Sequence, residues 1–465
     1  MCEGIDIACL PATTLQRALR ERRLSPVELT RACLTVYEKL NPELNAIVTL
    51  NDRVLEEART LETRPPTGLL YGLPVGIKDT TDTRGLRTTY GSSAYRDHVP
   101  ERDAEIVARL KAAGALILGK TNTPAFAVGG ETTNAVFGST RNPWDTTRSP
   151  GGSTGGGAVA VATGMVALAD GTDLGGSLRM PASFCGIVGL RPSPGIIPED
   201  SESFLWDRLS VAGGLGRTAG DVSLFMRAVA GSYDARPLQY PAHHPGFVLP
   251  ELRANMRLGY CDHLTDLEPA PVVAATCRSA INSLKSRSIS VESVDLSLTD
   301  APRAFAVVRA HHLLAVHRNR LNQPEAAGEH LTQNLSEAQS YSALDLADAE
   351  LIVDKTWRTF QRVFHEVDYL LTPTTAVLPF RLSDGYPRRI ENTVLSTYYD
   401  WFAPTSVLSL TGLPVASVPC GLSPEGLPVG IQIVGKPCQE AAVLALATLM
   451  QERCPISLPP ILQQL

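Results

Sequence analysis

Two glycine-rich tracts, each with a serine, flank a segment of small apolar residues, and this arrangement constrains the fold more than any other feature. The first tract is PGGSTGG at residues 150–156, and the second is GTDLGGSLRMP at residues 171–181. The segment AVAVATGMVALA at residues 158–169 is apolar on every side, so it predicts a helix buried inside the protein. A buried helix needs a large core, and 44% of the 465 residues are hydrophobic.

Helix and strand patterns are mixed along the rest of the chain. The capping box SPVE at residues 25–28 predicts a helix start, and residues 71–78 and 115–118 predict buried strands. Further helices are expected over 301–321, 342–367 and 440–450, and a glycine-rich loop followed by a short strand over 171–195. Residues 414–422 and 429–435 predict a β-hairpin. No linker divides these elements, so we expect one compact α/β domain with a helical N-terminal part.

Charge and cysteine content exclude several classes of protein. The net charge of −6 without a basic stripe argues against a nucleic-acid partner. The longest apolar run, at 158–169, is shorter than the roughly 18 residues that span a bilayer, so no membrane association is expected. The nine cysteines are scattered without a CxxC pair, which favours reduced thiols in a cytoplasmic protein over disulfides or a zinc site.

Two motif matches do not fit their usual structural context. Residues 114–121, GALILGKT, match the phosphate-binding P-loop pattern, but they follow a predicted helix and their middle residues form a strand themselves. Residues 151–155, GGSTG, match the nucleophile elbow of hydrolases, but no apolar strand precedes them, and the later histidines lie mostly on predicted helices. An alternative role for Ser153 is to cap a glycine-rich helix start.

The doublet Gly175-Gly176 before Ser177 is the third candidate. Consecutive glycines let backbone amides point into one cavity, which an oxyanion hole requires, although an ordinary tight turn also explains them. No histidine lies near Ser153 or Ser177 in the sequence, so a lysine that is neutral through burial is the candidate base. Lys78 ends an apolar strand and fits this description, with pairing to Asp79 as the alternative.

These motifs together resemble the amidase signature family. The resemblance covers nearly the whole chain, and it is carried by GLPVGIKD at 72–79, GKTNTPAFAVGGETTNAVFGSTRNPWD at 119–145, the two serine tracts, and residues 410–435. It implies a single large α/β domain over 1–465, with a central mixed β-sheet covered by helices on both faces. Within it, residues 1–65 would form a helical N-terminal cap and residues 66–200 the catalytic signature core.

The resemblance also implies an activity and a set of site residues. The enzyme would cleave a carboxylic amide to carboxylate and ammonia or amine through an acyl-enzyme on Ser177, with Lys78 as base, Ser153 as bridging serine and a cis Gly152–Ser153 peptide bond. Neither a metal nor an organic cofactor is needed. The remaining implied positions are the oxyanion-hole backbone at Leu174, Gly175, Gly176 and Ser177, the acyl-site wall at Gly129 and Gly130, and a structural pair of Asp173 and Arg179.

The glutaminase component of a tRNA-dependent amidotransferase shares this fold and triad, and is the alternative function. The stretch PSPGIIPEDSESFLWDRLSVAGGLGRT after Arg191 is more similar to free-standing amidases, which favours stand-alone hydrolysis. A small-molecule amide is therefore the expected partner, and a homodimer is considered for the assembly. Substrate-binding loops are expected at residues 199–210, 305–325 and 385–405.

Overall fold

A large mixed β-sheet organises the chain in the computed structural model, which describes residues 3–199, 204–232, 237–238 and 244–465. In the described residues the sheet has 11 strands in the order β1-β3-β2-β6-β8-β7-β14-β15-β11-β9-β10. Their bounds are β1 Ile47–Leu50, β2 Pro74–Lys78, β3 Leu116–Thr121, β6 Leu168–Asp173, β7 Val188–Arg191, β8 Val211–Gly216, β9 Met256–Tyr260, β10 Ile289–Ser293, β11 Tyr369–Pro373, β14 Val415–Leu422 and β15 Pro428–Val434.

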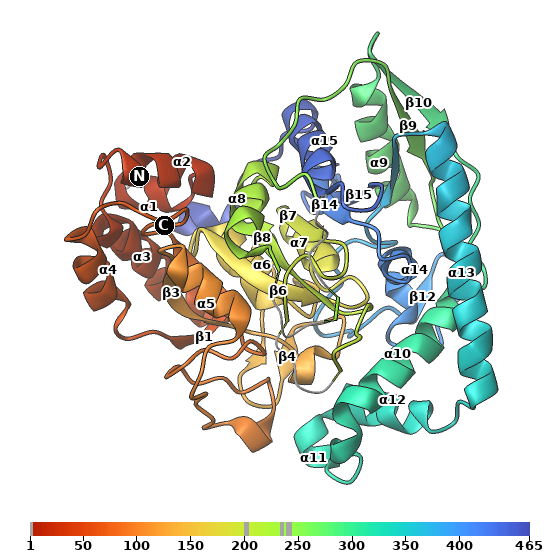
Figure 1. The fold of residues 1–465 in the computed structure, drawn as a ribbon, viewed down its shortest axis with the longest axis horizontal. Helices are drawn as coiled ribbons and strands as arrows, with labels where there is room; N and C mark the ends of the chain where they lie inside the picture. Colours follow the sequence, from red (N-terminus) through yellow and green to blue (C-terminus); the bar gives the residue numbers. More distant parts are fainter. Residues whose placement is uncertain (1–2, 200–203, 233–236, 239–243) are drawn as a thin grey trace.

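Two small hairpins lie outside this sheet, and helices surround it (Figure 1). The hairpins are β4 Thr133–Asn134 with β5 Gly138–Ser139, and β12 Arg389–Ile390 with β13 Thr393–Val394. The α-helices are α1 Glu3–Ala8, α2 Ala12–Arg20, α3 Pro26–Leu44, α4 Val54–Glu62, α5 Glu105–Ala112, α6 Gly155–Thr163, α7 Arg179–Cys185, α8 Ala219–Val229, α9 Pro271–Leu284, α10 Ala301–His317, α11 Pro324–Ala327, α12 Glu329–Ala338, α13 Ala343–Glu366, α14 Ala403–Ser409 and α15 Glu440–Arg453. Short 3-10 helices are η1 Ser93–Tyr95, η2 Ala125–Ala127, η3 Arg318–Arg320, η4 Asp400–Phe402 and η5 Pro460–Gln464.

Helices cover both faces of the sheet, as predicted. Two neighbouring glycines of β8 show this, because successive residues of a strand point to opposite faces. A Cβ at Gly213 would meet Leu178 at the start of α7, whereas one at Gly214 would meet Phe225 of α8. On the second face α15 packs against both α8 and α9, and on the first face α6 packs with α7. The predicted α/β fold with a central mixed sheet is therefore confirmed.

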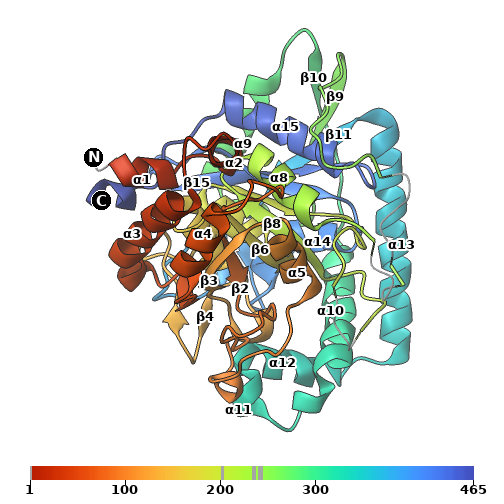
Figure 2. The ribbon, with the colours of Figure 1, turned by 60° about the vertical axis from the view of Figure 1, so that its left-hand side comes forward.

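The two ends of the molecule are built from different parts of the chain. Figures 1 and 2 show α1–α4 gathered at one end, while α10, α12 and the long α13 wrap the other. The first 65 residues also contribute β1, which pairs with β3 in the sheet. The predicted division into a 1–65 cap and a 66–200 core stays a prediction, and residue 200 lies outside the described residues.

Local sequence signals account for several element boundaries. The predicted capping box is present: Ser25 caps α3 together with Glu28, and two further capping boxes begin α8 and α13. The predicted buried helix is present as α6, but it is shorter than expected. It ends at Gly164, whose left-handed φ of +83° terminates the helix, and residues 168–173 form β6 instead. Likewise, the expected loop before β7 contains the helix α7.

The sequence analysis made predictions about membrane association, metal sites and disulfides, and each can be compared with the described residues. No helix among them is long and apolar enough to cross a membrane. No group of three or more potential metal ligands occurs in them. Each of their eight cysteines is a free thiol, and Cys2 lies outside this part of the chain.

Candidate active site

Lys78 lies at the end of β2, and its amine is buried among hydroxyl groups. The side chain is fully inaccessible to solvent. Its Nζ donates hydrogen bonds to Ser153 Oγ at 2.7 Å, Thr172 Oγ1 at 2.9 Å and Thr154 Oγ1 at 3.0 Å. All three acceptors are uncharged, so no carboxylate compensates a positive charge on this amine directly.

This environment lowers the pKa of Lys78 to about 7. Burial is the main cause, and it outweighs the opposing charges of Asp170, Asp173 and Glu199. The alternative in which Asp79 pairs with Lys78 is wrong. Asp79 instead accepts hydrogen bonds from the backbone and hydroxyl of Thr89, the latter at 2.5 Å. The amine is therefore largely uncharged just above neutral pH.

Ser153 is completely buried and precedes α6. The Gly152–Ser153 peptide bond is cis, as the resemblance implies. The helix has Thr154 at its N-cap, without a side-chain cap hydrogen bond, so the alternative role of Ser153 as a cap is wrong. Its hydroxyl is instead held by Lys78.

Ser177 follows β6 and is partly exposed to solvent. Its carbonyl oxygen accepts a hydrogen bond of 3.3 Å from the Thr154 N–H, which joins the two predicted serine loops. The Ser177 hydroxyl makes no hydrogen bond to any residue that the structure describes. The two serine loops are therefore joined through the backbone of Thr154 and Ser177, and the Ser177 hydroxyl has no partner in the described part of the chain.

The backbone amides of the loop 174–177 differ in whether they already have a hydrogen-bond acceptor. The Gly176 N–H donates to Asp173 Oδ1 at 2.9 Å, so this amide already has an acceptor, and its place in an oxyanion hole stays a prediction. Within the described chain, the N–H groups of Leu174, Gly175 and Ser177 donate to no protein acceptor. Gly176 has φ of +128° and lies against Thr405, which explains the need for glycine there.

Asp173 and Arg179 form the buried pair that the resemblance implies, and Arg179 extends it to distant elements. Its guanidinium donates to Thr405 O at 2.9 Å and, from its terminal N–H groups, to Gln432 Oε1 and Ser409 Oγ at 2.8 Å each. Arg191 contributes a second guanidinium 3.4 Å from Asp173, which the sequence analysis did not find.

Thr172 and Asp170 were also missed, although the sequence contains a signal for them. They are two residues apart on β6, so both side chains point to one face of the sheet. Thr172 binds the Lys78 amine, and Asp170 Oδ1 accepts the Lys78 backbone N–H at 2.5 Å. The strand over 168–173 was hidden because its first residues lie in the apolar segment that predicted a helix and its last residues lie in the tract that predicted a glycine-rich loop.

Gly129 and Gly130 lie beside two aromatic side chains. A Cβ at Gly129 would be 3.4 Å from His330 Cδ2, and one at Gly130 would be 2.8 Å from Trp401 Cζ2. The next residue, Glu131, packs its backbone against Gly152: a Cβ there would lie 2.7 Å from the Glu131 carbonyl carbon. This loop therefore borders the Gly152–Ser153 segment.

The rejected P-loop is a strand, as its residues suggested. Lys120 lies on β3, beside β2, with Ile77 as its register partner. Its Nζ donates to the Thr81 carbonyl and to Thr83 Oγ1, and burial lowers its pKa to about 8.

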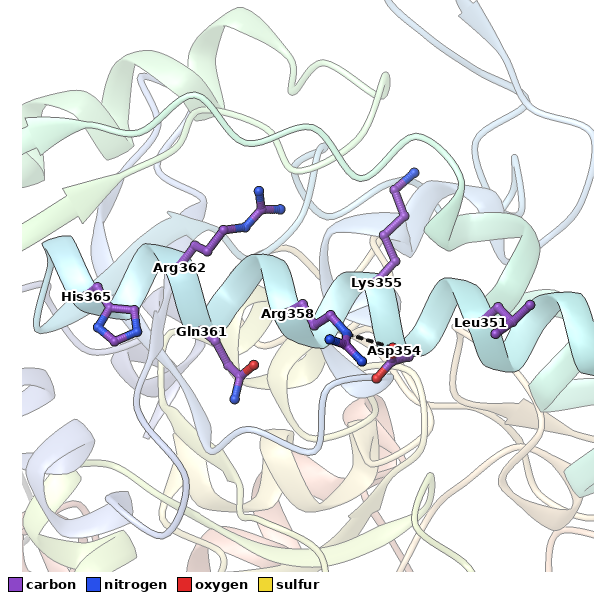
Figure 3. Close-up of a pocket in the computed structure, with 7 residues that line it drawn as sticks. All are labelled: Leu351, Asp354, Lys355, Arg358, Gln361, Arg362 and His365. Carbon is purple, nitrogen blue, oxygen red and sulfur yellow. Dashed lines mark hydrogen bonds and ion pairs between the residues drawn. The ribbon is translucent and has the colours of Figure 1, made fainter.

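Of the predicted substrate loops, residues 200–203 lie outside the described residues. Elsewhere, a hollow of about 590 Å³ lies along α13, where the side chains in Figure 3 project from a single helix. Its Asp354 and Arg358 are paired at 2.8 Å, and none of its lining residues belongs to the predicted site.

Comparisons with known proteins place this geometry in a family. The profile of the Amidase family matches residues 28–444. The A-type component of the glutamyl-tRNA(Gln) amidotransferase of Symbiobacterium thermophilum is 33% identical over 95% of this chain and 96% of that protein.

Comparison with solved structures leads to the same family. A bacterial aryl acylamidase of the amidase signature family has a TM-score of 0.85 and 26% identity, covering 96% of both chains. The A-type component of the glutamyl-tRNA(Gln) amidotransferase of Thermotoga maritima has a TM-score of 0.79 and 26% identity, covering 98% of this chain and 99% of that one. The chain therefore belongs to the amidase signature family, whose enzymes cleave the C–N bond of amides.

Proposed function

We propose that the chain is an amidohydrolase that hydrolyses a carboxylic amide through an acyl-enzyme on Ser177, with Lys78, Ser153 and Ser177 as its catalytic triad. The observation that carries this proposal is the 2.7 Å hydrogen bond between the buried Lys78 amine and Ser153 Oγ. A base without a charged partner and with a pKa near 7 is suited to proton transfer at neutral pH.

In the acylation step, neutral Lys78 accepts the proton of Ser153 while Ser153 accepts the proton of Ser177. Ser177 Oγ attacks the carbonyl carbon, and the N–H groups of Leu174, Gly175 and Ser177 are the candidates to stabilise the oxyanion. Ser153 then gives a proton to the leaving nitrogen, because an unprotonated amine anion is a poor leaving group, and it takes a proton back from Lys78, which becomes neutral again. The C–N bond breaks, which releases ammonia or amine and leaves the ester of Ser177.

Deacylation uses the same groups in the same order. A water molecule gives its proton to Ser153, and its oxygen attacks the ester carbonyl. Collapse of the second tetrahedral intermediate returns the proton to Ser177 and releases the carboxylate. No step in this cycle consumes a cofactor.

The Ser177→Ala variant tests the assignment of the nucleophile. It should lose amide hydrolysis and labelling by a fluorophosphonate probe, while Ser340→Ala, at an exposed position, should keep both. A circular dichroism spectrum checks that the variant is folded. Turnover of a folded Ser177→Ala protein at the rate of the unaltered enzyme would refute the triad.

A second candidate function is favoured by the sequence relatives, which carry the name of an amidotransferase component. In that case glutamine is the amide, and the ammonia passes to a partner that handles tRNA. Assays of glutamine hydrolysis, with the purified chain and with any co-purifying protein, distinguish the two. Rapid hydrolysis of simple amides by the chain alone supports stand-alone function, and glutamine hydrolysis that needs a partner supports the amidotransferase role. The expected absence of a nucleic-acid partner stays a prediction.

A further inference from the structure

Glu131 is an acidic residue beside the proposed triad that the mechanism does not use. Its backbone contacts Gly152, next to the bridging serine. Its carboxylate has no hydrogen bond or ion pair with any described residue, although the side chain is only partly exposed. A largely buried carboxylate without a partner is costly to ionise, so Glu131 does not contribute to the stability of the fold through its charge.

The surroundings of Glu131 contain further unpaired polar atoms. The indole Nε1 of Trp401 is fully buried and has no hydrogen-bond acceptor in the described chain. It lies 3.2 Å from the position of a Cβ on Gly130, the residue before Glu131. Nδ1 of His330, which packs against Gly129, is also buried and unpaired among these residues. Buried polar groups usually have partners. The indole N–H of Trp401 can only donate and so needs an acceptor, whereas the Glu131 carboxylate and an unprotonated His330 Nδ1 can accept hydrogen bonds from a donor in a ligand.

This loop is also connected to the nucleophile loop through aromatic side chains. Trp401 packs against Phe402 with ring centroids 5.5 Å apart, and Phe402 lies 3.2 Å from the position of a Cβ on Gly175. Gly130 lies against Trp401 and Gly175 lies against Phe402. The loop that carries Glu131 and the loop that carries the oxyanion amides are therefore linked through one pair of packed aromatic rings.

We propose that Glu131 is a specificity residue that binds a positively charged amine on the acyl part of the amide substrate. The chemistry that completes an unpaired carboxylate in an aromatic setting is a cation that donates hydrogen bonds, and a primary ammonium group does both. The substrate class is thus amides of amino-substituted carboxylic acids. This inference rests on the proposed function, because it assigns a subsite to the same reaction.

Matched pairs of primary amides test the proposal, because their leaving group is ammonia and only the acyl part differs. The pairs are 3-aminopropanamide with propanamide, 4-aminobutanamide with butanamide, and 5-aminopentanamide with pentanamide. For at least one pair, kcat/KM should favour the ammonium-bearing amide about tenfold or more, the size expected for a charge-assisted hydrogen bond. In Glu131→Gln this ratio should fall to near one. Glu38→Gln, which removes an exposed charge on α3, should keep the original ratio.

The pH dependence of the same ratio gives a second readout. Burial raises the pKa of Glu131 to about 7, so the preference for the ammonium substrate should rise as the pH increases through this value. The charged and titratable groups on the neighbouring segments include His330, whose pKa burial lowers, Glu329 and Arg309 beside it, and Lys78 behind Ser153. Lys78 ionises in the same pH range, and its positive charge disfavours only the ammonium amide, so it also contributes to the change in the ratio. Glu131→Gln retains Lys78, so most of the rise in the ratio with pH should be lost in this variant if Glu131 is its main cause.

The outcomes separate this inference from the proposed function. A preference for the neutral amides, or an ammonium preference that persists in Glu131→Gln, would overturn the role of Glu131. Fluorophosphonate labelling of Ser177 in each variant shows that the active centre is intact. If the unaltered protein neither labels nor hydrolyses any amide, the proposed function itself fails.

Discussion

Asp173 and Arg179 form a fully buried ion pair, in which Arg179 Nε donates to Asp173 Oδ2 and Arg179 Nη2 donates to Asp173 Oδ1, each at 2.9 Å. The same carboxylate accepts the N–H groups of Gly176 and Leu178. Burial opposes the ionisation of Asp173, but the guanidinium groups of Arg179 and Arg191 hold its pKa at about 2. The pair therefore fixes the loop that carries Ser177.

Replacing Asp173 by Asn should destabilise the protein by about 3–5 kcal/mol, because it leaves buried guanidinium groups without a counter-charge. Urea unfolding measures this change, and kcat should fall as the 174–177 loop loses its anchor. The matched control is Asp145→Asn, which breaks a more exposed pair with Arg148 and should cost less than about 1 kcal/mol. Equal stability losses in the two variants would contradict the role of the buried pair.

The pH dependence of catalysis should follow the ionisation of Lys78. Since the proposed base acts only when neutral and its pKa is about 7, kcat/KM should rise as the pH increases through this value and level off above it. Lys78→Ala should lower kcat/KM by about 10²–10⁴-fold and remove the rise. The exposed Lys39→Ala variant should keep the profile. A profile that stays flat from about one pH unit below this pKa to about one unit above it would argue against a lysine base.

Thr172→Val should move the acidic limb of this profile to lower pH. Thr172 accepts a hydrogen bond from Lys78 Nζ, and valine cannot accept one, so the ammonium form loses a partner and the pKa falls further. A displacement of about one pH unit is expected for the loss of a hydrogen bond to a charged group. Thr35→Val, an exposed position on α3, is the control. A limb that moves to higher pH would show that Thr172 does not stabilise the protonated amine.

Gly176→Ala should disrupt the loop of residues 174–177. A Cβ at this position would lie 2.3 Å from Thr405 Oγ1 and 2.6 Å from Thr405 Cβ, and the φ of +128° disfavours any side chain. The expected cost is about 1–3 kcal/mol of stability together with a loss of kcat. Gly426→Ala, with φ of +79° and open space around it, separates the backbone effect from the clash. Adding Thr405→Ala should restore part of the stability, and no restoration would mean that the clash is not the cause.

Short-range signals predicted elements well where one local pattern decided the outcome. The capping box at Ser25 and the apolar run ending at Lys78 needed no distant partner to be recognised, and both are present. The helix expected over 158–169 was too long because its composition is uniform and only Gly164 marks the end. The strand that follows it forms through pairing with β2 and β8, which are far away in the sequence.

The candidate site residues also differ in whether a local sequence pattern could identify them. The motif tracts indicated Lys78, Ser153 and Ser177, whose assignment as catalytic residues stays a proposal. They did not indicate Arg191, because its approach to Asp173 depends on the order of strands in the sheet. They also treated the four amides of 174–177 as equivalent, whereas the turn directs the Gly176 N–H to Asp173. Which way an amide points depends on backbone dihedral angles that composition does not determine.

The hydrogen bonds that Arg179 donates to Thr405 and Gln432 have a consequence during protein synthesis. Ser177 is the proposed nucleophile, and the loop that carries it is anchored by residues that the ribosome adds 226 and 253 positions after Arg179. A growing polypeptide thus exposes its serines long before it can arrange them, so premature or truncated products should be inert toward the amides of the cell.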